Sequence, residues 1–212
     1  SQNDNLAVPF PVGPSIPVKT GLGFDRDPSS GTGQFDVMFY KANIYVDHLD
    51  RAWDVINDPT KQSYSRSATA TVINYFNTGG EGNYSSNNTF PSLTIGADVE
   101  DFVIRATTSV VIPSPGYWTF GVNSDDGFEL TLDNGTKTFY TAYPDPRGPA
   151  DTLGVFNITQ SGTYDLELVF YERGGGSGVE LFAAPGSHTV FDPTVFDLVG
   201  DELHFHQVDG IA

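Results

Sequence analysis

The sequence contains no cysteine, which excludes disulfide bonds, thiolate catalysis and cysteine-ligated zinc. Basic residues are also scarce: 10 lysines and arginines stand against 27 acidic residues, and the formal net charge is −17. A surface of this charge repels nucleic acid and anionic membranes. No apolar run approaches the length of a transmembrane helix, so membrane insertion is not expected.

The first residues, "SQNDNLAVPF", lack the basic and apolar regions of a signal peptide. We therefore expect a mature form or an excised module of a larger protein. A secreted bacterial module of this size often has no disulfide, so the missing cysteines favour an extracellular bacterial protein.

Aromatic residues are plentiful, with 16 Phe and 10 Tyr, and they are enough for a substantial core. Residues 1–34 are rich in Pro, Gly and Ser and predict an extended lead-in. Strand-like runs separated by Gly, Pro, Asn and Asp turns follow at 34–46, 67–78, 101–113, 116–124, 127–135, 136–143, 152–159, 162–173, 178–185 and 201–208. Residues 48–59 carry Leu49, Trp53 and Ile56 at helical spacing, which predicts one short helix. The pattern indicates one all-β domain over residues 1–212, an antiparallel sandwich or barrel.

Two adjacent carboxylates interrupt the strand pattern in "GVNSDDGFELTLDNG", residues 121–135. On a regular strand the side chains of Asp125 and Asp126 would point to opposite faces. A cis peptide between them would shorten their Cα–Cα distance from about 3.8 to about 2.9 Å and turn both to one side. Carboxylate oxygens are the ligands that Ca²⁺ takes, so the pair suggests a calcium site.

A calcium shell needs about six to eight oxygens, more than two carboxylates supply. The glycine-rich segment "YERGGGSGVEL", residues 171–181, exposes backbone carbonyls that would complete the shell if it lies beside the pair. Water would hold the open positions, and a vicinal sugar diol could displace two waters. Each segment alone also fits an ordinary acidic turn or a flexible hairpin loop, so the hypothesis depends on their meeting in space.

Two longer segments carry a family resemblance. Residues 97–135 fit a pattern through Phe102, Pro113, Gly116, Trp118, Phe120, Ser124 to Gly127, Leu130 and Asp133, and residues 161–186 fit its later strands. From about residue 90 to 186 the chain resembles the protective-antigen-fourteen domain. The resemblance implies a β-sandwich, here with one short peripheral helix.

In the lectin branch of that family, found in fungal flocculins and bacterial adhesins, the resemblance implies calcium-dependent sugar binding. Asp125 and Asp126, joined by a cis peptide, would hold Ca²⁺ and meet the sugar. Arg173, Gly174 and Gly175 would complete the metal site, mainly through backbone carbonyls, with Arg173 and Gly174 also near the sugar. Bacterial lectins of this type often have an uncharged polar residue where Arg173 stands, and the Arg173 side chain could instead bond a sugar hydroxyl.

Other candidates have simpler explanations. Glu202, His204 and His206 share one face of a strand and could hold a transition metal, but a polar strand face explains them as well. Trp118 fits core packing better than sugar stacking. Tyr143, Asp145 and Arg147 lie in a loop that could line a pocket.

No nucleophile elbow or metalloprotease motif is present, so we do not expect an enzyme. The sequence predicts a non-catalytic, calcium-dependent lectin module of a larger secreted adhesin. Its partners would be cell-surface glycans or polysaccharides with fucose-, glucose- or mannose-type sugars. Two alternatives stay open: a carbohydrate-targeting accessory domain of a glycoside hydrolase, and a structural spacer without sugar binding.

Overall fold

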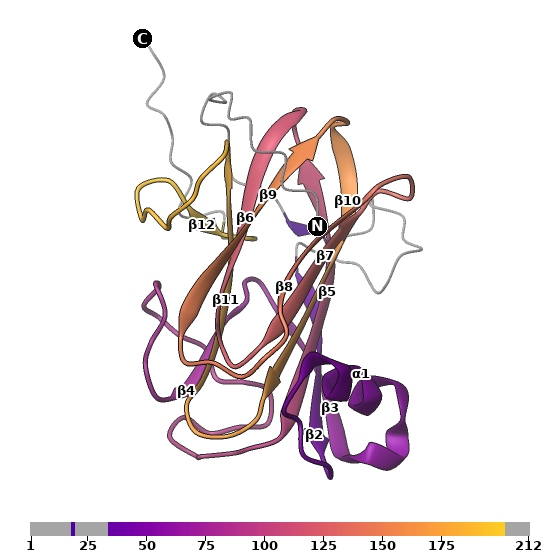
Figure 1. The fold of residues 1–212 in the computed structure, drawn as a ribbon, viewed down its shortest axis with the longest axis vertical. Helices are drawn as coiled ribbons and strands as arrows, with labels where there is room; N and C mark the ends of the chain where they lie inside the picture. Colours follow the sequence, from indigo (N-terminus) through magenta and orange to yellow (C-terminus); the bar gives the residue numbers. More distant parts are fainter. Residues whose placement is uncertain (1–17, 20–33, 202–212) are drawn as a thin grey trace.

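The computed structural model describes Val18–Lys19 and residues 34–201. Its strands form two antiparallel sheets that face each other, which confirms the predicted β-sandwich (Figure 1). The seven-stranded sheet has the order β3-β2-β5-β10-β7-β8, with β1 paired to β5; the five-stranded sheet has the order β12-β11-β6-β9, with β4 paired to β11. The strands are β1 Val18–Lys19, β2 Phe35–Ala42, β3 Gln62–Ala70, β4 Asn74–Thr78, β5 Phe102–Ile112, β6 Gly116–Asp125, β7 Phe128–Asp133, β8 Thr138–Tyr143, β9 Ala150–Ile158, β10 Gly162–Glu172, β11 Ser177–Pro185 and β12 Asp197–Leu198.

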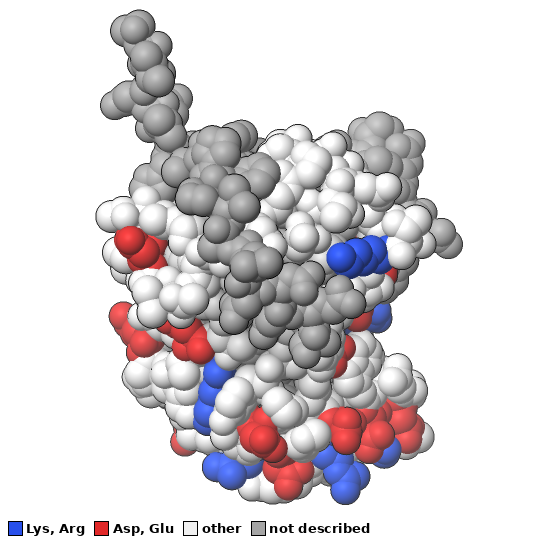
Figure 2. Space-filling view, turned by 45° about the horizontal axis from the view of Figure 1, so that its top comes forward, with Lys and Arg blue, Asp and Glu red and all other residues white. Residues whose placement is uncertain are grey.

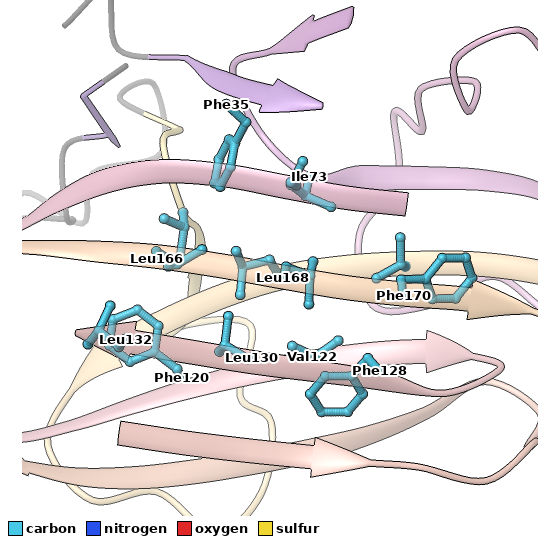
Figure 3. Close-up of a cluster of buried hydrophobic side chains, with 14 of the residues drawn as sticks. Phe35, Ile73, Phe120, Val122, Phe128, Leu130, Leu132, Leu166, Leu168 and Phe170 are labelled. Atoms are coloured by element: carbon cyan, nitrogen blue, oxygen red, sulfur yellow. The ribbon is translucent and has the colours of Figure 1, made fainter. Parts of the chain in front are cut away.

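The core lies between the two sheets and is built by alternation along the strands. On β10 every second residue from Tyr164 to Phe170 points inward, and the same holds from Phe128 to Leu132 on β7. Figure 3 shows Leu166, Leu168 and Phe170 of β10 and the three β7 side chains in one cluster with Phe120 and Val122 of β6. Burial of this aromatic and aliphatic surface is the main source of stability.

Most predicted strands are confirmed, with one clear error. Residues 67–78 were expected to form one strand, but β3 ends at Ala70 and β4 begins at Asn74, and these two strands belong to different sheets. The chain leaves one sheet at residues 71–73 and buries Ile73 between the layers. Strand 201–208 and most of the 1–34 lead-in lie outside the described residues.

The predicted helix is confirmed as α1, Leu49–Asn57, followed by the short 3-10 helix Pro59–Lys61. The His48 ring Nδ1 accepts a hydrogen bond from the Asp50 N–H and caps the helix. The apolar side of α1 packs on the outer face of the seven-stranded sheet against Tyr40, Val103 and Tyr171. Among the described helices none is long and apolar enough to span a membrane.

Two connections between the sheets lie side by side at the end of the sandwich that is lowest in Figure 1. The chain passes from β6 in the five-stranded sheet to β7 in the seven-stranded sheet, and it returns from β10 to β11. Because β6 pairs with β11 and β7 pairs with β10, the two connections are neighbours. This topology brings residues 125–127 next to residues 172–177.

The packing of the core predicts how much stability the protein loses when a buried side chain is shortened. Leu168 is fully buried at the centre of β10, so Leu168→Ala should lower the free energy of unfolding by about 2–5 kcal/mol through lost burial and a cavity. Chemical denaturation measures the change. Ser67→Ala on exposed β3 is the matched control and should change stability little; an equal loss in both variants would contradict this packing.

Candidate metal centre

Three carboxylates meet where the two connections cross. The Asp125–Asp126 peptide is cis, as the family resemblance implied. One oxygen each from Asp125, Asp126 and Glu172 lies within 4.8 Å of the others. The exposed fractions of these residues are 9%, 4% and 0%, so the cluster is largely withdrawn from solvent.

Asp126 is held from two sides by backbone groups. Its Oδ1 accepts a hydrogen bond of 3.0 Å from the N–H of Arg147, and its Oδ2 accepts one of 2.8 Å from the N–H of Arg173. These donors come from different loops, the one after β8 and the one after β10. The carboxylate is therefore fixed in direction independently of any bound ion.

The loop after β8, residues 144–149, is fastened to this place by the Arg147 side chain. Its guanidinium donates hydrogen bonds to the backbone carbonyl and the hydroxyl of Ser124 and to the hydroxyl of Thr152. It also lies over the Tyr143 ring, 4.3 Å from the centroid. Arg147 thus joins this loop to β6 directly before the aspartate pair.

Glu172 is the unusual member of the cluster, because neither of its carboxylate oxygens has a hydrogen-bond partner among the described residues. Burial, with the negative charges of Asp126 and Asp125 beside it, raises the pKa of Glu172 to about 10. The nearby Gly174 N–H acts in the opposite direction and lowers that pKa, without making a hydrogen bond of ordinary geometry. Burial and the charge of Asp126 likewise raise the pKa of Asp125 to about 7.

Glycines let the backbone pass close to the cluster. A Cβ on Gly176 would lie 2.8 Å from the Cα of Gly79 and 3.1 Å from Oδ2 of Asp125, so a side chain there would displace one or the other. The loop after β10 and the loop after β4 therefore touch through bare backbone beside Asp125. The Thr78 hydroxyl adds a hydrogen bond of 3.2 Å to the Gly175 carbonyl across this contact.

The structure brings the predicted loop residues 173–175 beside the aspartate pair. The contact seen is a donation from the Arg173 N–H, while the Arg173 side chain is exposed. The Gly175 carbonyl already accepts from Thr78, and Gly174 faces Glu100. The assignment of Arg173, Gly174 and Gly175 as carbonyl ligands therefore stays a prediction.

Sequence reasoning missed Glu172, although a signal was present. On β10 every second side chain from Tyr164 to Phe170 faces the core, and Glu172 continues that row. A carboxylate in a core row at the end of a strand is a mark of a functional position. The same reasoning named Arg147 but gave it no role.

The other residues that the sequence suggested for a site lie away from the carboxylate cluster or outside the described residues. Trp118 is 1% exposed and donates its indole N–H to the Ser114 carbonyl, which confirms that it packs in the core. Asp145 is exposed and lies 3.9 Å from His48, so it does not belong to the carboxylate cluster. Glu202, His204 and His206 lie outside the described residues.

The chemistry of the cluster fits a hard cation. All three side chains offer oxygen, and three buried carboxylates repel one another unless a positive charge or protons lie among them. Protein groups compensate this repulsion only in part: Asp126 accepts two backbone hydrogen bonds, whereas Glu172 accepts none of ordinary geometry and has only the Gly174 N–H nearby. The two bare oxygens of Glu172 are what a divalent ion such as Ca²⁺ would satisfy.

The PA14 domain family model matches residues 58–189, which is more than half of the chain. The chain therefore belongs to the PA14 domain family, which is the protective-antigen-fourteen family that its sequence resembles. A comparison with curated proteins finds no match.

Solved structures similar to the chain include three from this family or from adhesins. The PA14 domain of the MpAFP antifreeze protein has 15% identity and a TM-score of 0.53, covering 85% of this chain and 100% of that one. A PA14 sugar-binding domain from an RTX adhesin has 16% identity and a TM-score of 0.53, covering 78% and 93%. The Epithelial Adhesin 6 A domain from Candida glabrata, in complex with Galβ1-3GlcNAc, has 13% identity and a TM-score of 0.52, covering 90% and 91%. At these identities the likeness shows a shared fold.

The raised pKa values predict how stability depends on pH when no cation is bound. The unfolded chain releases the protons of Asp125 and Glu172 near pH 4, whereas the folded protein keeps them to about pH 7 and about pH 10. Stability from these groups is therefore greatest in acid, falls as pH rises from about 4, and levels off above each folded pKa. Glu172→Gln, which cannot ionise, should lose less stability than the wild type between pH 5 and pH 9 in chelator.

Thermal unfolding across that pH range measures the difference. Glu100→Gln, at an exposed position beside the same loop, is the control and should follow the wild type. A Glu172→Gln variant that loses as much stability as the wild type would contradict a buried, proton-holding Glu172.

Proposed function

We propose that this PA14 domain is a non-catalytic, calcium-dependent carbohydrate-binding module, with Asp125, Asp126 and Glu172 as the protein carboxylates around the ion. The observation that carries the proposal is the pair of buried Glu172 oxygens without a partner, facing two aspartates. When bound, Ca²⁺ would supply coordination positions for two neighbouring hydroxyls of a sugar.

The chain's own residues prepare the site. Asp126 is already oriented by the N–H groups of Arg147 and Arg173, so its direction costs little when a ligand arrives. The Arg173 side chain is exposed at the edge of the cluster and is available to bond a sugar hydroxyl. We propose that backbone carbonyls of residues 173–175, which directly follow Glu172 in the chain, add oxygen ligands.

Charge supports a cation and a neutral sugar over an anionic partner. The chain carries a net charge of −17, and acidic side chains lie over much of the lower half of the face in Figure 2, with basic ones among them. Asp98 is close enough to Glu172 to raise the pKa of Glu172 further. Screening at physiological salt weakens such fields beyond about 8 Å, so they act on ligands at the site itself.

The class of ligand is supported by the printed descriptions of similar structures, one named a sugar-binding domain of an adhesin and one determined with Galβ1-3GlcNAc. For this chain we infer cell-surface glycans or polysaccharides, with fucose-, glucose- or mannose-type sugars among them. The setting we propose is a secreted, multidomain bacterial adhesin at the cell surface. A single shallow site binds weakly, and many copies on one surface would make adhesion strong.

The proposal is tested by Asp126→Asn, which removes one carboxylate charge from the ion site and weakens the two backbone hydrogen bonds. We expect loss of the calcium-induced rise in melting temperature and loss of binding on a glycan array, with the sandwich still folded. Wild-type binding should disappear in chelator and return with added Ca²⁺ at about 10⁻⁴–10⁻³ M or below.

Asp50→Asn is the matched control, because Asp50 is exposed on α1 and lies outside the cluster. It should keep both responses. Glycan binding that is insensitive to chelator, or intact in Asp126→Asn, would refute the metal-bridged mechanism. A calcium response without any glycan binding would instead identify a structural spacer with a structural ion.

A further inference from the structure

A small cavity opens directly beside the candidate ion site. The centre of a water-sized sphere can move within about 10 Å³ of it. The strand side is lined by Asn123, Asp125 and Gly178, and the loop side by Gly80, Asn87 and Pro149. A cavity of this size holds about one water-sized group and cannot take a sugar ring. Asp125 lines this cavity and also belongs to the carboxylate cluster, so the two adjoin at this residue.

The loop side of the cavity is held in place by a buried carboxylate. Glu180 on β11 is 2% exposed, and its two oxygens accept hydrogen bonds from the N–H groups of Asn83 at 2.7 Å and Tyr84 at 2.9 Å. Asn83 also donates its side-chain amide to Asp151 on β9. The loop after β4, residues 79–88, is thus pinned across the five-stranded sheet, and the cavity is a fixed feature of the fold.

The strand side is polar and equally fixed. Asn123 pairs with Glu180 across β6 and β11 and with Asp151 across β6 and β9. Its side-chain amide donates to Asp151 at 2.8 Å. A group entering the cavity would therefore meet oriented amide and carboxylate groups, which suits a hydroxyl that both donates and accepts.

We propose that this cavity receives the 6-hydroxyl of the sugar whose ring hydroxyls lie at the ion site, with the hydroxymethyl carbon at the cavity mouth. The inference rests on the proposed function and narrows it to hexopyranoses with a free 6-hydroxyl, the glucose, mannose and galactose type. Sugars of the 6-deoxy type, such as fucose, would leave the polar cavity without a partner. The hydroxymethyl carbon is attached to the same ring as the coordinating diol, so the inference requires that one sugar reach both places.

The first test compares sugars that differ only at carbon 6, in saturating CaCl₂ and by calorimetry. The pairs are D-galactose with D-fucose, D-glucose with 6-deoxy-D-glucose, and D-mannose with D-rhamnose. For the epimer that binds, we expect the parent sugar to bind about 3- to 10-fold more tightly than its 6-deoxy partner, the worth of one neutral hydrogen bond.

The second test narrows the cavity without touching the carboxylates. A Cβ on Gly80 would lie 3.1 Å from Cγ of Pro149, on the loop side of the cavity. Because Gly80 does not have a positive φ, alanine fits its backbone conformation. Gly80→Ala should weaken the parent sugar to the level of its 6-deoxy partner and leave the 6-deoxy sugar and calcium affinity unchanged. Gly148→Ala, whose Cβ would meet nothing within 4 Å, is the matched control and should change neither.

The outcomes separate this inference from the function on which it rests. Equal binding of parent and 6-deoxy sugars by the wild type means that the cavity holds only water, and overturns the inference while calcium-dependent binding stands. An equal loss of both sugars in Gly80→Ala overturns it in the same way. Absence of binding for every pair in CaCl₂ overturns the inference; if L-fucose and the glycan array also show no calcium-dependent binding, the proposed function is overturned with it.

Discussion

The repulsion among three buried carboxylates is the interaction on which the rest of the site depends. Asp125, Asp126 and Glu172 lie within one cluster, and burial deprives their charges of water. A fold keeps such a cluster only if positive charge or protons compensate it and if the surrounding structure is stable enough to carry the cost. Here the large aromatic core between the sheets provides that stability, and two neighbouring crossings between the sheets hold the carboxylates together.

Compensation is uneven across the three groups, and this decides what the cluster can bind. Asp126 receives two backbone hydrogen bonds, Asp125 has the Arg147 guanidinium nearby, and Glu172 has no hydrogen-bond partner among the described residues. The protein therefore fixes the direction of the Asp126 carboxylate and lowers the pKa of Asp125 through the charge of Arg147. It leaves both Glu172 oxygens without a hydrogen-bond partner among the described residues. Under the proposed function, a cation that takes oxygen ligands would complete the compensation that the protein groups leave unfinished.

Much of the fold could be predicted from the sequence, because alternation along strands and turn residues such as Asn134-Gly135 are local signals. The prediction failed at residues 67–78, where an apparently continuous strand changes sheets; a change of sheet is a tertiary event and leaves little local trace. The aspartate pair was found because two adjacent acids contradict the pleat. Glu172 was missed although its place in the inward row of β10 marked it, and Arg147 could not be given a role because its partners come from other elements.

In the proposed mechanism, strands position the ion ligands and loops shape the cavity that would select the sugar. The carboxylates sit at the ends of β6 and β10 or directly after them, where the sheets fix their positions, whereas the loop side of the cavity consists of residues from the loops after β4 and β8. Asp125 is the one residue common to both, so a change there disturbs ion and cavity together. A change at Gly80 or Pro149 alters the shape of the cavity without removing an oxygen ligand. Loops tolerate substitution better than core strands do, so a fold of this kind can change the sugar it prefers while keeping the ion site on which binding depends.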